Sequence, residues 1–304
     1  MPNVIEIKNL HKSYKKVKAV KGIDLAVGEG SFFALLGENG AGKSTTINII
    51  ATLIPKTSGD VWVNGHSADR DARAVRRDIG VVFQGHTLDR HLSVRENIIH
   101  RGALYGLTRP QAEMRLNALA GRIGVTEFLG RRYGTLSGGQ KRRADILRAL
   151  INEPRILILD EPTTGLDPHT RQSVWETILG LRRQNGLTVF LTTHYMEEAA
   201  GADHIVIMDR GTVRASGTPE QLRLAFSTDR LILIPRDADS VSTALRDMNT
   251  PYTTDRDRIV IPLHDSLEAA GIINRLKDDV AGLEVIRGTM DDVFINATRG
   301  GAAV

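Results

Sequence analysis

The sequence has no cysteine among its 304 residues. It can therefore form neither disulfide bonds nor thiolate metal sites, which suits a reducing compartment such as the cytoplasm. The apolar content of 41% is enough for a sizeable core. The length suggests two domains, one large and one small.

Long apolar runs are also missing. The longest runs, such as 156–159 and 231–234, are far shorter than the ~20 residues that cross a bilayer as a helix. Residues 1–6 lack the charged and then apolar pattern of a signal peptide. The net charge of +4 is mild and gives little support for a nucleic-acid partner. We therefore expect no transmembrane helix and no nucleic acid, so that any membrane role must come through a partner protein.

What the sequence does contain is a phosphate-binding loop. Residues 37–45 fit the pattern G-x-x-x-x-G-K-S/T, after the apolar run 32–36 and before a helical pattern. The glycines let backbone N–H groups turn around an anion, and the helix offers its positive N-terminal end. Lys43 would bridge the β- and γ-phosphates, and the Ser44 hydroxyl would hold Mg²⁺. The residues expected to bind the nucleotide here are Gly37, Asn39, Gly40, Ala41, Gly42, Lys43, Ser44 and Thr45.

Two acids follow the apolar run 156–159, which is typical of a strand buried on both faces of a parallel sheet. Asp160 and Glu161 would then face the ligand crevice at the carboxyl end of that strand. Asp160 can hold Mg²⁺ through water, and Glu161 can polarise the attacking water as a general base. The alternative, a pair of surface acids, is disfavoured by the apolar strand before them.

Three single residues have open roles on local sequence alone. Tyr14, in the turn between two short strands, could stack on an adenine ring or simply pack on an edge strand. Gln84 follows the β-type run 79–83, where a solvated turn residue is usual. His194 follows the strand 187–192 and could either bind a γ-phosphate or be structural.

A second candidate anion site begins at Ser137, where two glycines open an amphipathic helix. A hydroxyl, bare backbone N–H groups and a helix N-terminus suit an anion, but an ordinary helix cap uses the same residues. The charges at 141–143 predict a solvent-facing surface. Asp167 stands before Pro168 as a helix N-cap, so a role at an interface would be additional.

The order of patterns predicts an α/β domain at 1–227 and a small domain at 228–304. An all-helical insert begins near residue 92 and closes near 145. After residue 230 the order is strand, helix, strand, strand, helix, strand and a last helix. This is the βαββαβ order of a split, ferredoxin-like α+β unit.

Taken in this order, the motifs resemble those of the nucleotide-binding subunit of an ATP-binding cassette (ABC) transporter, over about residues 4–226. Residues 37–45 resemble the Walker A loop, and 156–161 resemble Walker B with its catalytic glutamate. Residues 136–140, Leu-Ser-Gly-Gly-Gln, resemble the family signature, which other phosphate-loop proteins lack. The resemblance implies a P-loop NTPase fold with a RecA-like core, an N-terminal antiparallel β-subdomain and a helical subdomain at about 92–145.

The resemblance also gives the single residues roles. Tyr14 matches the adenine-stacking aromatic, Gln84 the loop that senses Mg²⁺ and contacts the membrane partner, and His194 the switch histidine. Residues 165–167 match the D-loop. The implied catalytic residues are Glu161 and His194. The implied Mg²⁺-binding residues are Ser44, Gln84 and, through water, Asp160.

In this family each ATP lies between the phosphate loop of one cassette and the signature of another. The resemblance therefore implies an ATPase that pairs head to tail, here as a homodimer with two competent sites, using ATP and Mg²⁺. The residues expected to reach the partner's ATP are Ser137, Gly138, Gly139, Gln140 and Asp167. The dimer would drive integral membrane permease subunits from the cytoplasmic face of the membrane, with residues 85–96 as the coupling surface.

The tail narrows the choice within the family. Residues 290–294 resemble the end of the daunorubicin-type drug-exporter branch, usually Leu-Glu-Asp-Val-Phe, although Met290 and Asp291 depart from it. This favours export of a drug, antibiotic or lipid-type cargo, and the tail domain would support pairing. The alternative is a soluble cassette ATPase that acts on ribosomes or nucleic acid, but the chain has neither a second cassette nor a coiled-coil insertion. A small-molecule kinase would not explain residues 136–140.

Overall fold

The structure is a computed structural model that describes residues 2–263 and 265–299. Its internal contacts divide the chain into two units, one ending at Ser216 and the other beginning at Gly217. Each unit has its own apolar core. Among the described residues, no helix combines the length and apolar character needed to cross a membrane.

A six-stranded sheet forms the centre of the first unit, in the order β10-β9-β3-β8-β7-β6. Its strands are β3 (Phe32–Leu36), β6 (Ile79–Val82), β7 (Ile156–Asp160), β8 (Thr188–Thr193), β9 (His204–Asp209) and β10 (Thr212–Gly217). The five strands from β9 to β6 run parallel. Every residue of β3, β7 and β8 is buried, which explains why the strands show no alternation of apolar and polar residues; the polar members are Asp160 in β7 and three threonines in β8. The carboxyl ends of the three strands therefore meet at one edge.

A second, antiparallel sheet has the order β2-β1-β4-β5. Its strands are β1 (Asn3–Tyr14), β2 (Val17–Gly28), β4 (Ser58–Val63) and β5 (His66–Ser67). Tyr14 is the last residue of β1, not a turn residue as predicted. Apolar side chains from this sheet, from α1 (Lys43–Ile50) and from the central sheet form one continuous core. The N-terminal β-subdomain is thus fused to the core around α1.

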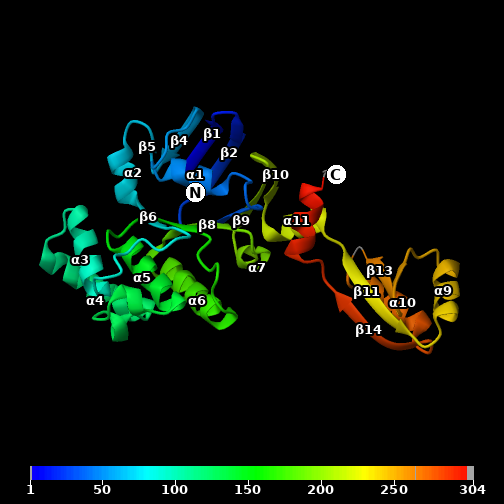
Figure 1. The fold of residues 1–304 in the computed structure, drawn as a ribbon. Coiled ribbons are helices and arrows are strands. Elements are labelled where there is room, and N and C mark those ends of the chain that lie inside the picture. The colour runs from blue at the N-terminus through cyan, green and yellow to red at the C-terminus, as the bar shows by residue number, and fades with distance from the viewer. Residues whose placement is uncertain (1, 264, 300–304) are drawn as a thin grey trace. The chain divides into compact units, whose positions relative to one another are not determined.

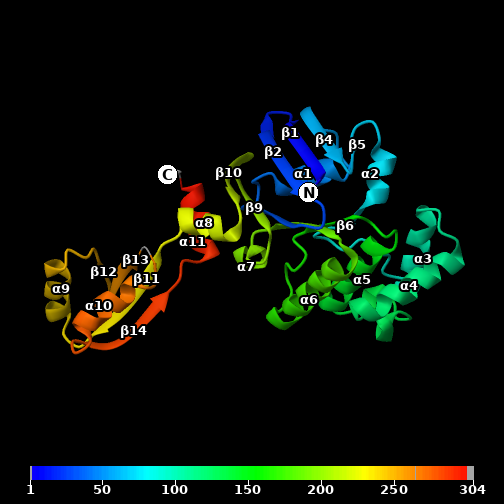
Figure 2. The same cartoon turned by 180° about the vertical axis from the view of Figure 1, so that it is seen from behind.

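Helices cover the central sheet on both sides. The other helices of the first unit are α2 (Ala72–Asp78), α3 (Val94–Leu104), α4 (Arg109–Ile123), α5 (Gly138–Leu150), α6 (Pro168–Asn185) and α7 (Met196–Ala199), with single 3₁₀ turns η1 (Thr126–Phe128) and η2 (Tyr133–Thr135). Figures 1 and 2 show α1 on one face of the sheet and α5 and α6 on the other. Helices α3, α4 and α5 pack together as the predicted helical subdomain.

The second unit contains the predicted βαββαβ order. Its elements are α8 (Pro219–Phe226), β11 (Asp229–Pro235), α9 (Ala238–Asp247), β12 (Thr253–Asp255), β13 (Arg258–Leu263), α10 (Glu268–Leu276), β14 (Val280–Ile286) and α11 (Met290–Thr298). The sheet order β12-β13-β11-β14, with antiparallel neighbours, is that of a ferredoxin-like unit. Helix α8 packs on α11. The division at residues 227 and 228 stays a prediction.

Candidate functional site

The phosphate loop joins β3 to α1, and its conformation depends on glycine. Gly40 and Gly42 have φ of 87° and 107°, in the left-handed region that side chains disfavour. A Cβ atom on Gly37 would lie 2.6 Å from the carbonyl oxygen of Met208. Gly42 is also the residue that precedes the first turn of α1. The loop therefore brings bare backbone to the positive end of a helix, as an anion site requires.

Lys43 is held inside this loop and is only 4% exposed. Its ammonium group donates hydrogen bonds to the carbonyl oxygens of Gly37 at 2.7 Å and Glu38 at 3.1 Å. It lies 3.7 Å from Oε1 of Glu161. Burial lowers the pKa of Lys43, although the nearby carboxylates oppose this shift. Phosphate oxygens are better acceptors for this buried cation than neutral carbonyls.

Asp160 ends β7 and faces the first turn of α1. Ser44 Oγ donates a hydrogen bond to Asp160 Oδ1 at 3.3 Å, and Thr192 Oγ1 donates to the same oxygen at 2.6 Å. The fold thus brings together Ser44 and Asp160, two of the residues predicted to hold Mg²⁺. Thr192 was not predicted, because only the parallel pairing of β7 with β8 places it beside Asp160.

Glu161 follows β7 with a φ of 47°, a strained conformation for a residue other than glycine. Its Oε2 accepts hydrogen bonds from Gln84 Nε2 and from Thr164 Oγ1, each at 3.2 Å. His194 Nδ1 also lies 3.2 Å from this oxygen, but has no hydrogen-bond partner among the described residues. The structure therefore brings Gln84 and His194 to the carboxylate of Glu161.

These groups open into a cleft of about 610 Å³. Its lining residues are Val17, Lys18, Ala19, Lys21, Asn39, Gly40, Gly42, Lys43, Ser44, Thr45, Gln84, Glu161 and Arg210. No motif in the sequence marks Lys18, Lys21 or Arg210 as site residues, since isolated surface cations carry none. Tyr14 is not among the described lining residues; the residue is 44% exposed, and the Lys12 ammonium lies 4.9 Å from the centre of its ring. Its stacking role stays a prediction.

The signature residues and Asp167 act locally as helix caps. Ser137 accepts a hydrogen bond from the Gln140 N–H, and the Gln140 side chain returns one to the Ser137 N–H. Asp167 caps α6 by accepting from the Thr170 N–H at 3.0 Å, and hydrogen bonds from Thr170 lower the pKa of Asp167. Within the described part of the chain, none of the five residues expected to reach the partner's ATP lines the cleft.

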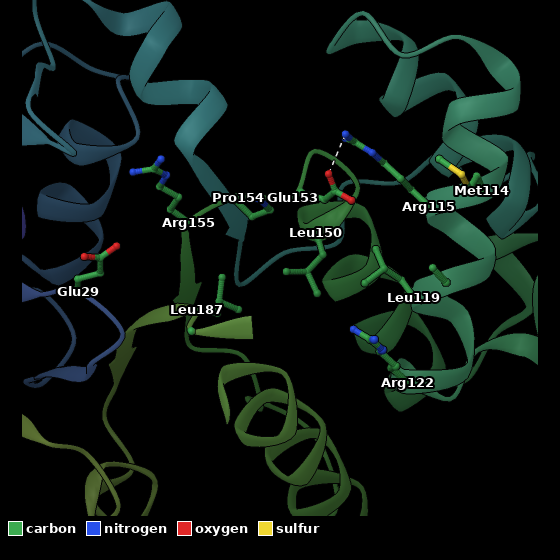
Figure 3. Close-up of a pocket in the computed structure, with 12 residues that line it drawn as sticks. Glu29, Met114, Arg115, Leu119, Arg122, Leu150, Glu153, Pro154, Arg155 and Leu187 are labelled. Carbon is green, nitrogen blue, oxygen red and sulfur yellow. Dashed lines mark ion pairs between the residues drawn. The ribbon is translucent and has the colours of Figure 1, made fainter. Parts of the chain in front are cut away.

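A second cavity, of about 630 Å³, lies at the opposite edge of the sheet, near the amino ends of β7 and β8 (Figure 3). It is lined by residues from α4, the end of α5 and nearby turns. Figure 3 shows Arg115 and Glu153 facing each other, with 2.7 Å between Nη2 and Oε2. None of the motif residues named above is among its described lining residues. We assign this cavity no catalytic role.

The comparisons with known proteins agree with this geometry. The family described as ABC transporter matches residues 20–164. The daunorubicin resistance ATP-binding protein DrrA3 of Streptomyces coeruleorubidus is 38% identical over 304 residues, which cover 97% of this chain and 95% of that protein. The chain belongs to the ABC transporter family. The linearmycin resistance ATP-binding protein LnrL of Bacillus subtilis is 40% identical, over 75% of this chain and 74% of its own.

Solved structures confirm the cassette fold. The dimeric structure of MJ0796, a bacterial ABC transporter cassette, is 31% identical and superimposes with a TM-score of 0.65. The match covers 71% of this chain and 98% of that one. A post-hydrolysis form of the same cassette, bound to ADP and Pi, gives a TM-score of 0.63. The predictions of an ABC cassette, of ATP binding and of ATPase activity are confirmed.

Proposed function

We propose that this ABC ATPase powers a drug-type exporter, paired head to tail with a second copy and attached to separate membrane permease subunits. The observation that carries the proposal is that Lys43, Gln84 and Glu161 line one cleft, with His194 3.2 Å from Glu161, while the signature residues lie outside that cleft. A cassette whose signature lies outside its own cleft would supply the phosphate loop to one composite site and the signature to a second.

The nucleotide would occupy the cleft with its phosphates in the loop 37–45. Lys43 would exchange its backbone acceptors for β- and γ-phosphate oxygens. Backbone N–H groups and the α1 N-terminus would stabilise the charge that develops during transfer. Glu161 would polarise the attacking water, and His194 would contact the γ-phosphate.

The residues around Asp160 fit Mg²⁺. The Ser44 hydroxyl, the Asp160 carboxylate and the side-chain carbonyl of Gln84 supply oxygen atoms, the ligands that Mg²⁺ prefers. Gln84 uses its amide nitrogen on Glu161, so its oxygen is available to the ion. When bound, Mg²⁺ would neutralise charge on the β- and γ-phosphates.

The second cassette would supply Ser137, Gly138 and Gly139 to the γ-phosphate, with Gln140 and Asp167 at the same interface. Ser137 and both glycines stand at the positive end of a 13-residue helix, α5. Closing two such sites would draw the attached permease subunits together, and hydrolysis would release them. The loop 85–96 would contact the permease, and the second domain would support pairing.

The relatives support efflux as the purpose. They include daunorubicin, doxorubicin and linearmycin resistance proteins and proteins of Nod factor export. The first of these matches almost the whole chain, including the ferredoxin-like domain. We therefore infer an exporter at the cytoplasmic face of the membrane with a drug, antibiotic or lipid-type cargo. The soluble alternative, acting on ribosomes or nucleic acid, draws no support from these relatives.

The test is a detergent pull-down of the tagged full-length chain from its native membranes, followed by ATPase assays of the recovered complex. Glu161→Gln is the test variant, and exposed Glu197→Gln on α7 is the matched control. Recovery with a polytopic membrane protein, and turnover lost only in Glu161→Gln, supports the proposal. Recovery with ribosomes or DNA and no membrane protein overturns the exporter function but leaves the ATPase chemistry standing.

A further inference from the structure

Helix α5, which begins at the signature, buries three charged side chains spaced three residues apart. Arg142, Asp145 and Arg148 are 2%, 1% and 6% exposed. The prediction that the charges at 141–143 face solvent is therefore wrong for Arg142. Buried charges are tolerated only when they are well hydrogen-bonded, so their partners reveal what this face of the helix is for.

The two arginines hold the backbone of β6 and the residues that follow it. Arg142 Nη1 donates to the Phe83 carbonyl at 2.7 Å, and Nη2 donates to the Gln84 carbonyl at 3.0 Å. Arg148 donates to the Val81 carbonyl, two residues before Phe83. The backbone that carries Gln84 is thus fixed to the signature helix, while the Gln84 side chain remains in the nucleotide cleft.

Asp145 joins the segment that follows Gln84 to the segment that precedes the signature. The Tyr133 hydroxyl donates to both carboxylate oxygens at 3.1 Å, and His86 Nδ1 lies 2.7 Å from Oδ2. Since a carboxylate only accepts, Nδ1 of His86 carries the hydrogen. Burial, and next the Asp145 charge, raise the pKa of Tyr133, so its hydroxyl stays a donor. Tyr133 stands four residues before Ser137, and His86 two residues after Gln84.

Backbone hydrogen bonds also join these two segments. The Tyr133 N–H donates to Leu92, and the Gly134 N–H donates to Arg90. At its far end the loop wraps around the buried Asn97 side chain, which bonds the backbone of residues 89, 92 and 93. Residues 85–96, which form a loop and the first turn of α3, are therefore joined with η2 (Tyr133–Thr135) into one hydrogen-bonded body.

We propose that Asp145 is a positioning residue that holds Gln84 and the signature helix in one body, through His86 and Tyr133. Gln84 serves the chain's own nucleotide, and Ser137 serves the partner's. A rigid link between Gln84 and Ser137 makes the two composite sites form together. The same link transmits any movement of residues 85–96 to both composite sites. This inference rests on the proposed function, because it uses the head-to-tail pair.

The test is a double-mutant cycle on the full-length chain with Asp145→Asn and His86→Ala. Asparagine keeps the size of the side chain, but its NH₂ group faces a donor from either Tyr133 or His86 and so breaks one contact. We expect kcat for ATP to fall about five- to tenfold, with KM within about twofold, because coupling networks have effects of this order. The double variant should be no worse than the stronger single variant.

The matched control is Asp60→Asn, at an exposed carboxylate on β4, which should leave kcat and KM at wild-type values. An unchanged kcat in Asp145→Asn, a rise in KM alone, or additive effects of the two substitutions would each overturn the proposal. If the wild-type chain does not hydrolyse Mg-ATP at all, the proposed function fails instead.

A distance measurement tests the link without turnover. Because the chain has no cysteine, Thr87→Cys and Thr135→Cys can be spin-labelled without background. Both residues are exposed, one in the loop and one before the signature. We expect one narrow distance distribution with and without ATP, and a broad one after Asp145→Asn. A distribution that Asp145→Asn leaves unchanged, or one already broad in the wild-type chain, contradicts a rigid link.

Discussion

The Gln84 amide donates a hydrogen bond to Oε2 of Glu161 at 3.2 Å, across 77 residues of sequence. The contact exists because β6 and β7 are parallel neighbours, so the residues that follow them meet at the same sheet edge. It places the residue expected to sense the metal directly on the expected general base. The orientation of the Glu161 carboxylate is thereby linked to the position of the Gln84 side chain.

Gln84→Ala should separate nucleotide binding from hydrolysis. The substitution removes a metal-binding oxygen and the amide that orients Glu161, but none of the phosphate loop. We expect kcat to fall about tenfold, with ATP affinity in the absence of Mg²⁺ within about twofold of wild type. Steady-state kinetics and fluorescent-nucleotide titration measure the two effects. Exposed Gln172→Ala on α6 is the control. Equal loss of affinity and turnover would argue against this division of roles.

Lys43→Met should remove ATP binding without harming the apo fold. Burial lowers the pKa of Lys43, which means that the folded chain disfavours the charged form. A neutral side chain of similar length is therefore tolerated, whereas the phosphates lose their buried cation. Saturating ATP should stabilise the wild type by about 3 kcal/mol at 100 times Kd and leave the variant unchanged. Thermal unfolding with and without ATP decides the point; a variant whose Tm still rises with ATP would show that Lys43 is not the phosphate ligand.

The cap at Asp167 predicts a pH-dependent part of the stability. Hydrogen bonds from Thr170 hold the pKa of Asp167 below its ordinary value of 3.8. The stabilisation is therefore complete above that value and is lost as the pH falls through the folded-state pKa. Asp167→Ala should destabilise the chain at pH 7, and this difference should shrink below about pH 4. Urea unfolding at both pH values measures it.

Asp167→Asn separates the capping role from a role at the dimer interface. Asparagine caps helices as well as aspartate, so stability at pH 7 should be kept. If Asp167 also serves the partner's site, turnover should fall in Asp167→Asn while stability does not. A variant with normal kcat would leave capping as the whole function of this residue.

Much of this site follows from short patterns in the sequence. Asp167 and Pro168 begin α6, and the apolar run 156–159 delivers Asp160 and Glu161 to the sheet edge, as predicted. Local chemistry decides these features: caps use particular residue types, and a strand buried on both faces is mostly apolar without alternation.

Other features depend on partners far away in the sequence. Arg142 looks like one of three surface charges until α5 is placed against β6, where its acceptors are the carbonyl groups of residues 83 and 84. Asp145 meets His86 across 59 residues, and no local pattern marks either one. Backbone acceptors are the same for every residue type, so sequence alone gives them no signal.

The ferredoxin-like unit offers a test of its supporting role. Leu233 is fully buried in its core, and truncating it to alanine should cost about 2–5 kcal/mol there. If this domain supports pairing, Leu233→Ala should shift the ATP-bound chain from dimer to monomer in analytical ultracentrifugation, measured in a Glu161→Gln background. Nucleotide binding to the monomer should remain. Exposed Leu267→Ala is the control. A dimer that survives in Leu233→Ala would make the domain a brace only.

Gly139→Ala tests the signature directly, and a loss of turnover in this variant would have one of two causes. A Cβ atom at Gly139 would lie 2.4 Å from Cγ2 of Thr170, so the substitution forces α5 and α6 apart. In the proposed pair, Gly139 also belongs to the signature that meets the partner's γ-phosphate. We expect kcat to fall at least tenfold with ATP binding by the monomer intact, since the phosphate loop is untouched.

Thr170→Ser distinguishes the two causes, because it removes Cγ2 and keeps the hydroxyl. If the clash with Thr170 is the only harm, adding Thr170→Ser to Gly139→Ala should restore turnover to near the level of Thr170→Ser alone. If glycine at position 139 is also needed where the signature meets the partner's γ-phosphate, the double variant stays inactive while its melting temperature recovers. Recovered stability without recovered turnover is the result that the head-to-tail pair requires.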